Sequence, residues 1–196
     1  MDPGFGRAVS CPCQRQTFEQ RRRASLMKYC NLPDTDSPRT FDNYTIPPGS
    51  DEMLRAALDV VEGIAKFATF IGPVNTGKTH LASAICHEYI DNGIPAKFYS
   101  TGIFLRDLRE TFDHDSVNKY HTVFDRACTV PLLVLDDFYQ GKRTDWMTDE
   151  LENLVNERYL AKLPTVFTTN VPLSEMSERV ASRLQRESWC RVVVVE

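Results

Sequence analysis

The chain of 196 residues has room for one domain with a short appendage, and its 42% hydrophobic and 26% charged residues are typical of a globular protein with a sizeable core. A net charge of −4 at pH 7 does not favour a protein that coats nucleic acid in general. The longest apolar runs, residues 130–135 and 192–195, are far shorter than the roughly 18 residues of a membrane span. We therefore expect a cytoplasmic protein without a membrane partner.

The cysteines argue against both a disulfide framework and a zinc module. All six are scattered along the chain, as expected for reduced thiols. Cys11, Cys13 and Cys30 provide one ligand fewer than a structural zinc site needs, and no histidine precedes His80. Zinc is therefore not expected.

The first 50 residues are predicted to form a basic arm, residues 1–30, and an extended linker, residues 31–50. The arm has six basic and two acidic side chains, a net charge of +4, so the rest of the chain carries about −8. A helix is expected around residues 17–29. A basic arm on an acidic body suggests a docking element or a nucleic-acid contact, although a solvated helix face explains the same charges. The linker is rich in proline, aspartate, serine and threonine.

Residues 51–196 change to alternating helices and strands. Ser50 is a candidate N-cap of the first helix, in which Leu54, Leu58, Val61 and Ile64 recur near helical spacing. Apolar strands are predicted at residues 67–71, 97–100, 131–135, 165–168 and 191–195. Further helices are predicted at residues 78–91, 103–112, 117–128, 145–161 and 173–185. This alternation predicts an α/β fold, a parallel sheet with helices on both faces.

The strongest motif is GPVNTGKT at residues 72–79, which fits G-x-x-x-x-G-K-[ST] between a predicted strand and a predicted helix. Backbone N–H groups of such a loop point at phosphate oxygens, and the following helix adds its N-terminal dipole. Gly77 allows a close approach because it lacks a Cβ. Lys78 is expected to reach the β- and γ-phosphates of ATP, and Thr79 to bind Mg²⁺. The expected nucleotide-binding residues are Gly72, Pro73, Val74, Asn75, Thr76, Gly77, Lys78, Thr79 and His80.

Polar residues also follow two later strands. Asp136 and Asp137 end LLVLDD at residues 132–137, and parallel sheets collect ligands at the carboxyl ends of their strands. Asp136 is suited to hold Mg²⁺ through its water shell, and Asp137 to polarise the attacking water. Asn170 ends TTN at residues 168–170 and is suited to orient that water against the γ-phosphate.

Two arginines near the C-terminus are candidate catalytic residues. Arg179 and Arg183 are four residues apart in a predicted helix, so they share one helix face. The phosphate loop supplies one cation, Lys78, and the transition state on the γ-phosphate usually needs another, which a neighbouring subunit can provide. We therefore expect self-association with the ATP site at the interface. A solvated helix face is the alternative.

With these motifs in place, the chain resembles the helicase-loader branch of the AAA+ ATPases, which includes the DnaC/DnaI-type loaders of bacteria and phages and the IstB-type transposition helpers. The resemblance covers roughly residues 38–196. It rests on RTFDNY at 39–44, GPVNTGKTHLA at 72–82, LLVLDDF at 132–138, TDWMTDELENLVNERY at 144–159, LPTVFTTN at 163–170 and ERVASRL at 178–184. It implies a P-loop NTPase of three αβα layers with a five-stranded sheet. In that sheet, strand 165–168 separates the Asp136 strand from the strand before the phosphate loop.

The resemblance also implies roles for single residues. Asn170 becomes the sensor-one residue, and Arg183, with Arg179, the finger offered to the next subunit. Asp137 stands where many AAA+ proteins carry Glu. Its shorter carboxylate sits about 1 Å further back, an offset that can cost on the order of 100-fold in rate, so slow turnover is expected. The chain stops after the fifth strand, so no C-terminal helical lid is expected.

The implied function is ATP-dependent loading or remodelling of a replicative DnaB-type helicase in DNA replication. ATP and Mg²⁺ would be the cofactors and single-stranded DNA a co-ligand. Three alternatives stay open. They are an IstB-type helper that assembles on duplex DNA and recruits a transposase, an ATP-binding switch with negligible hydrolysis, and a small-molecule kinase. A kinase would need a substrate lid and acceptor-binding residues, which the paired arginines do not supply.

Overall fold

The computed structural model describes residues 12–45, 47, 49–110 and 117–195. Its centre is one sheet of five parallel strands in the order β2-β3-β4-β1-β5. The strands are β1 (Phe67–Ile71), β2 (Ala96–Ser100), β3 (Leu132–Asp136), β4 (Thr165–Thr169) and β5 (Cys190–Val194). Since β4 lies between β3 and β1, the strand order implied by the resemblance is confirmed.

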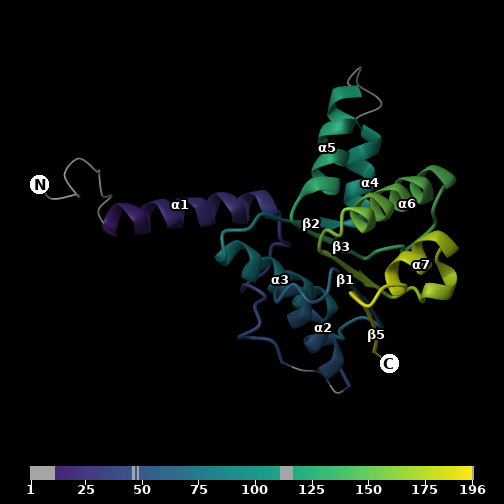
Figure 1. The fold of residues 1–196 in the computed structure, drawn as a ribbon, viewed down its shortest axis with the longest axis horizontal. Helices are drawn as coiled ribbons and strands as arrows, with labels where there is room; N and C mark the ends of the chain where they lie inside the picture. Colours follow the sequence, from purple (N-terminus) through teal and green to yellow (C-terminus); the bar gives the residue numbers. More distant parts are fainter. Residues whose placement is uncertain (1–11, 46, 48, 111–116, 196) are drawn as a thin grey trace, which may run out of the picture.

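Helices cover both faces of this sheet and complete three layers (Figure 1). They are α1 (Pro12–Cys30), α2 (Asp51–Val61), α3 (Lys78–Asp91), α4 (Thr101–Glu110), α5 (Val117–Thr129), α6 (Asp145–Leu160) and α7 (Glu178–Gln185). Side chains alternate along each strand, as the pleat requires. Ala68 and Phe70 of β1 therefore pack with α2 and α3, whereas Phe67 packs with the helices of the other face. Among the described residues, none of the helices is both long and apolar enough to cross a bilayer.

The apolar stripe predicted for α2 is only partly buried. Leu54 and Val61 pack against the core, but Leu58 is 39% exposed, and Ile64, beyond the end of the helix, is 53% exposed. The buried side chains of the helix are those of Met53, Ala56, Ala57 and Val60. This second stripe also has helical spacing, and its two alanines allow the helix to approach the sheet closely. Ser50 does not cap the helix with its side chain. Its Oγ donates instead to the carbonyl oxygen of Pro47 at 2.7 Å.

The N-terminal helix α1 is anchored at its C-terminal end and projects outward at the other (Figure 1). Leu26, Met27 and the fully buried Cys30 join the core formed by α2, α3 and one face of the sheet. Phe18, nearer the start of the helix, is 68% exposed. Of the cysteines considered for zinc, Cys30 thus packs in the apolar core in a cluster with Cys86. Cys11 and the side chain of Cys13 lie outside the described residues.

The predicted linker is held on the body. We call residues 32–44 the strap, because they run from the end of α1 across the start of α3. The strap contains no helix or strand, but Leu32, Phe41 and Tyr44 pack against the core. Nε2 of His80, in α3, lies 2.8 Å from the carbonyl oxygen of Thr40. This part of the chain is therefore not a free tether.

Candidate nucleotide-binding site

The phosphate loop joins β1 to α3, and its two glycines, Gly72 and Gly77, both lie close to other parts of the chain. Gly77 caps α3 with φ = 86°, and a Cβ there would lie 2.8 Å from the ring of Tyr44 in the strap. A Cβ on Gly72 would lie 2.7 Å from the carbonyl oxygen of Val195. Asn75 also has a left-handed backbone, with φ = 66°. Both glycines are therefore required by close approach, and Gly77 also by its left-handed backbone.

Lys78 points into this curl. Its side chain is 8% exposed, and Nζ donates to the carbonyl oxygens of Gly72 at 2.7 Å and Pro73 at 2.5 Å. Burial lowers the pKa of Lys78, and the nearby carboxylates of Asp136 and Asp137 oppose that effect. The ammonium group is thus within the phosphate loop, next to the space expected for phosphate oxygens, and it donates to carbonyl oxygens of the loop itself.

The two predicted magnesium ligands meet at the end of β3. Thr79 Oγ1 donates to Asp136 Oδ1 at 2.9 Å. Thr168, at the end of β4, donates a second hydroxyl hydrogen bond to the same oxygen. Burial raises the pKa of Asp136, and these two hydroxyls oppose it. A hydroxyl and a carboxylate at this distance are the hard oxygen donors that Mg²⁺ prefers, so the residues present fit the ion.

Asp137 and Asn170 lie beside this pair at the carboxyl ends of β3 and β4. The backbone of Asp137 is left-handed, with φ = 55°, and its N–H donates to Thr168 Oγ1 at 3.1 Å. Its exposed carboxylate accepts a hydrogen bond of 3.0 Å from the side chain of Gln140. Thr168 therefore positions both acidic residues, a role that the TTN motif alone did not reveal.

These residues surround one open cavity of about 700 Å³. Its lining includes all predicted loop residues except Gly72 and Pro73, and also Asp136, Asp137 and Asn170. Three further lining residues were not singled out from the sequence: Pro33, Arg39 and Gln140. Arg39 belongs to the RTFDNY stretch that carried part of the resemblance, which was the only signal pointing to it.

The predicted finger arginines are absent from the lining of this cavity. On α7, both Nε and an Nη atom of Arg183 donate to Asn156 Oδ1, at 3.3 and 3.0 Å, and the guanidinium lies 4.8 Å from the ring centre of Tyr159. Arg179 forms an ion pair of 3.5 Å with Glu152. Both arginines therefore face α6 of their own chain. They could act in catalysis only at the nucleotide cavity of a second copy of the chain.

Comparison with known proteins places this site in a family. Residues 13–184 match the family model described as IstB-like ATP binding protein. The replicative helicase loader DnaI of Bacillus subtilis is 25% identical over 173 residues, which covers 85% of this chain and 55% of the relative. The loader DnaC of Escherichia coli is 28% identical over 150 residues, covering 74% of this chain and 60% of the relative. An ATP-binding protein in an insertion sequence of Mycobacterium tuberculosis is 29% identical over 157 residues, covering 77% and 61%.

Solved structures show the same fold. Domain III of the Thermotoga maritima replication initiation protein DnaA aligns with a TM-score of 0.71 and 24% identity, covering 84% of this chain and 69% of that one. A crystal structure of the DnaC helicase loader aligns with a TM-score of 0.67 and 25% identity, covering 86% and 99%. The chain spans little more than half the length of the first curated relatives it matches. Because the family model covers most of its residues, and the phosphate loop and paired acidic residues stand in place, the chain belongs to the IstB-like ATP-binding protein family.

Proposed function

We propose that this protein is an ATPase that loads or remodels a replicative DnaB-type helicase, with single-stranded DNA as a co-ligand. The observation that carries the ATPase activity is the meeting of Lys78, Thr79 and Asp136 in one cavity at the carboxyl end of the sheet. The relatives that are named replicative helicase loaders support the partner.

In the proposed reaction, the loop backbone and the N-terminus of α3 bind the polyphosphate. Lys78 exchanges its carbonyl partners for phosphate oxygens, while Thr79 and Asp136 hold Mg²⁺. The ion neutralises charge on the β- and γ-phosphates when it is bound. Asp137 accepts the proton of the attacking water on its exposed carboxylate, while Gln140 donates a hydrogen bond to Oδ1 of the same group.

Slow hydrolysis is part of the proposal, because the side chain of Asp137 is shorter than the glutamate that many AAA+ proteins carry at this position. We propose that such an enzyme works as a switch: it stays in the ATP-bound state for a long time, and its bound partners determine when ATP is hydrolysed. A steady-state turnover rate above about 1 s⁻¹, the lower end of the range typical of enzymes, would contradict the proposal of slow hydrolysis.

Replacing Arg183 by alanine is expected to preserve nucleotide binding and to abolish hydrolysis, since Arg183 does not line the cavity of its own chain. Removing a finger arginine typically costs about 10³-fold or more in rate. Mixing Arg183→Ala protein with Lys78→Ala protein tests the trans role. The first has an intact site and the second an intact finger, so mixed assemblies should regain some phosphate release.

Arg55→Ala is the matched control for this experiment. It removes an exposed arginine of α2 that lies outside the nucleotide cavity. If Arg183→Ala hydrolyses ATP at the parent rate, or if mixing restores nothing, the trans-acting role of Arg183 is wrong.

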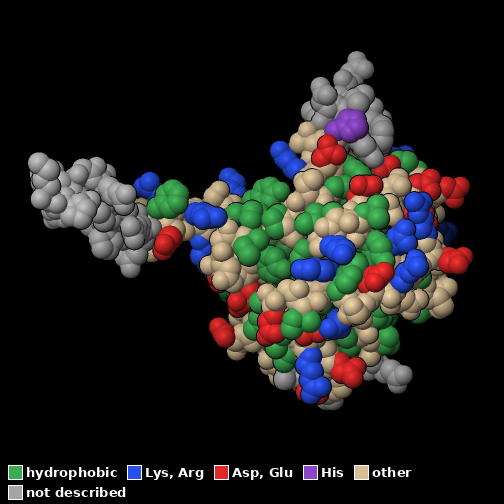
Figure 2. All heavy atoms as spheres, in the orientation of Figure 1, with side chains coloured by type: hydrophobic (Ala, Val, Ile, Leu, Met, Phe, Trp, Pro, Cys, Tyr) green, Lys and Arg blue, Asp and Glu red, His purple; other side chains and the backbone are tan. Residues whose placement is uncertain are grey.

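The exposed part of α1 is the proposed helicase-docking element. Figure 2 shows basic and hydrophobic side chains along it, beyond the body. Arg22 donates to the carbonyl oxygen of Gly93 at 2.9 Å and Arg23 pairs with Asp91, so both are engaged at the end of α3. Phe18 and Arg21 are both exposed and lie three residues apart, which places them on one face of the helix. Aromatic and arginine side chains are frequent anchors of protein interfaces.

The double variant Phe18→Ala/Arg21→Glu is therefore expected to lose co-purification with the host's replicative helicase, while it binds ATP like the parent. It is a cleaner test than deletion of residues 1–30, which would strip Leu26, Met27 and Cys30 from the core. Arg55→Glu, at an exposed position of α2, is the charge-matched control. Full helicase binding by the double variant would refute this docking site.

The relative from an insertion sequence supports a second candidate, an ATP-dependent helper of transposition that assembles on duplex DNA. The same double variant separates the two functions. Retained helicase binding together with lost binding to a duplex oligonucleotide would favour the transposition helper.

A further inference from the structure

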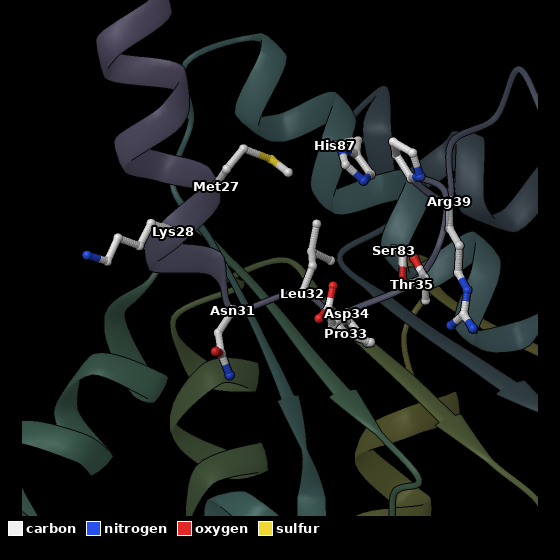
Figure 3. A pocket seen from close by; sticks show the side chains of 11 residues that line it. Met27, Lys28, Asn31, Leu32, Pro33, Asp34, Thr35, Arg39, Ser83 and His87 are labelled. Carbon is white, nitrogen blue, oxygen red and sulfur yellow. The ribbon is translucent and has the colours of Figure 1, made fainter.

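The strap residue Arg39 lies in the wall between two cavities. One is the nucleotide cavity, and the other, of about 420 Å³, lies between the end of α1, the strap and α3 (Figure 3). Pro33 and Arg39 line both. Figure 3 shows the guanidinium of Arg39 extending away from His87 and Met27, which line the smaller cavity.

Arg39 is half-buried but has no ion-pair partner among the residues that the structure describes. Other arginines near the core are held by the protein itself: Arg191 pairs with Asp59, and Arg158 and Arg183 donate hydrogen bonds to uncharged acceptors.

The backbone on both sides of Arg39 is fixed in place. The side chain of Asn43 accepts from the N–H of Thr40 at 2.9 Å and donates to the carbonyl oxygen of Pro38 at 2.7 Å, which closes a turn around Arg39. The carbonyl of Thr40 meets His80, the residue after the phosphate loop, at 2.8 Å. The position of Arg39 at the cavity is thus determined by the strap and does not depend on a partner for its side chain.

We propose that Arg39 is a nucleotide-binding residue that contacts the polyphosphate of ATP bound by the same chain. This rests on the proposed function, in which that cavity holds ATP. Among the lining residues, Lys78 and Arg39 are the permanently cationic side chains. A guanidinium binds phosphate oxygens in a bidentate manner and keeps its charge at all physiological pH values. The contact would also tie the strap, and through it α1, to the nucleotide.

The test is Arg39→Gln, which keeps a polar but shorter side chain and removes its charge. Its affinity for a fluorescent ATP analogue is expected to fall at least tenfold, a change of about 1.4 kcal/mol. Arg39→Lys should recover part of that loss. Inorganic tripolyphosphate, used as a competitor, should lose affinity for Arg39→Gln by the same factor as ATP, since it offers the phosphates without a base or sugar.

Arg55→Gln is the control, because Arg55 is an exposed arginine of α2 outside both cavities. Thermal unfolding without nucleotide should be alike for parent and variants, which excludes a loss of folding. Unchanged ATP affinity of Arg39→Gln would overturn the inference. So would a weaker ATP complex with unchanged tripolyphosphate binding, because that result assigns Arg39 to the base or sugar. If the parent itself bound no ATP, the proposed function would fail instead.

Discussion

Replacement of Lys78 by alanine is expected to lower the affinity for ATP at least 100-fold, a loss of about 2.8 kcal/mol. Nζ lies inside the curl of the phosphate loop, where it would make charge-assisted hydrogen bonds to phosphate, and such bonds are about twice as strong as neutral ones. Binding of a fluorescent ATP analogue measures the effect.

The fold should survive this change, although Lys78 is more enclosed than a purely ligand-facing residue. Its buried bonds go to the carbonyls of Gly72 and Pro73 in the loop itself, not to the sheet. Lys78→Met, which keeps the aliphatic stem, reports on packing alone. Lys66→Met is the matched control, because Lys66 precedes β1 at the opposite end of that strand from the loop. A folded Lys78→Ala protein, judged by far-UV circular dichroism, with parent affinity would refute the site.

Replacement of Arg158 by methionine is expected to destabilise the protein by about 3–5 kcal/mol, because several buried carbonyl oxygens lose their donor at about 1–3 kcal/mol each. Arg158 of α6 is 0% exposed. It donates to Thr165 Oγ1 at 2.8 Å and to the carbonyl oxygens of Ala127 at 2.8 Å, Val130 at 2.9 Å and Pro164 at 2.6 Å. Burial lowers its pKa to about 9, so the guanidinium is still charged at neutral pH.

Arg158 thereby ties the ends of α5 and α6 to the starts of β3 and β4. Methionine would remove the donor of these acceptors, of which the carbonyl of Pro164 would keep only the N–H of Leu133. At roughly 2–4 °C per kcal/mol for a chain of this size, the midpoint of thermal unfolding should fall by about 10 °C. Arg179→Met, at a half-exposed position of α7, should change it little. An Arg158→Met protein with the parent midpoint would show that the network contributes nothing to stability.

The features that could be predicted from the amino-acid sequence are those encoded by neighbouring residues. The phosphate loop has its eight positions in one stretch, and α3 and β1 have the bounds that periodicity and apolar content predicted. The position of β4 between β3 and β1 followed from the family resemblance. The acidic pair after β3 was expected at the carboxyl edge of a parallel sheet because all strands of such a sheet end on the same side.

Features that depend on distant residues needed the tertiary structure. Both stripes of α2 have helical spacing, and only packing against the sheet shows that the one with Ala56 and Ala57 is buried. Thr168 holds Asp136 from 32 positions away, and Arg158 joins α6 to the end of α5 and the start of β4. Arg39 reaches the nucleotide cavity because Asn43 and His80 hold the strap over α3. Local patterns determine helices, strands and loops, whereas the partners of a buried or converging side chain depend on which segments the fold brings together.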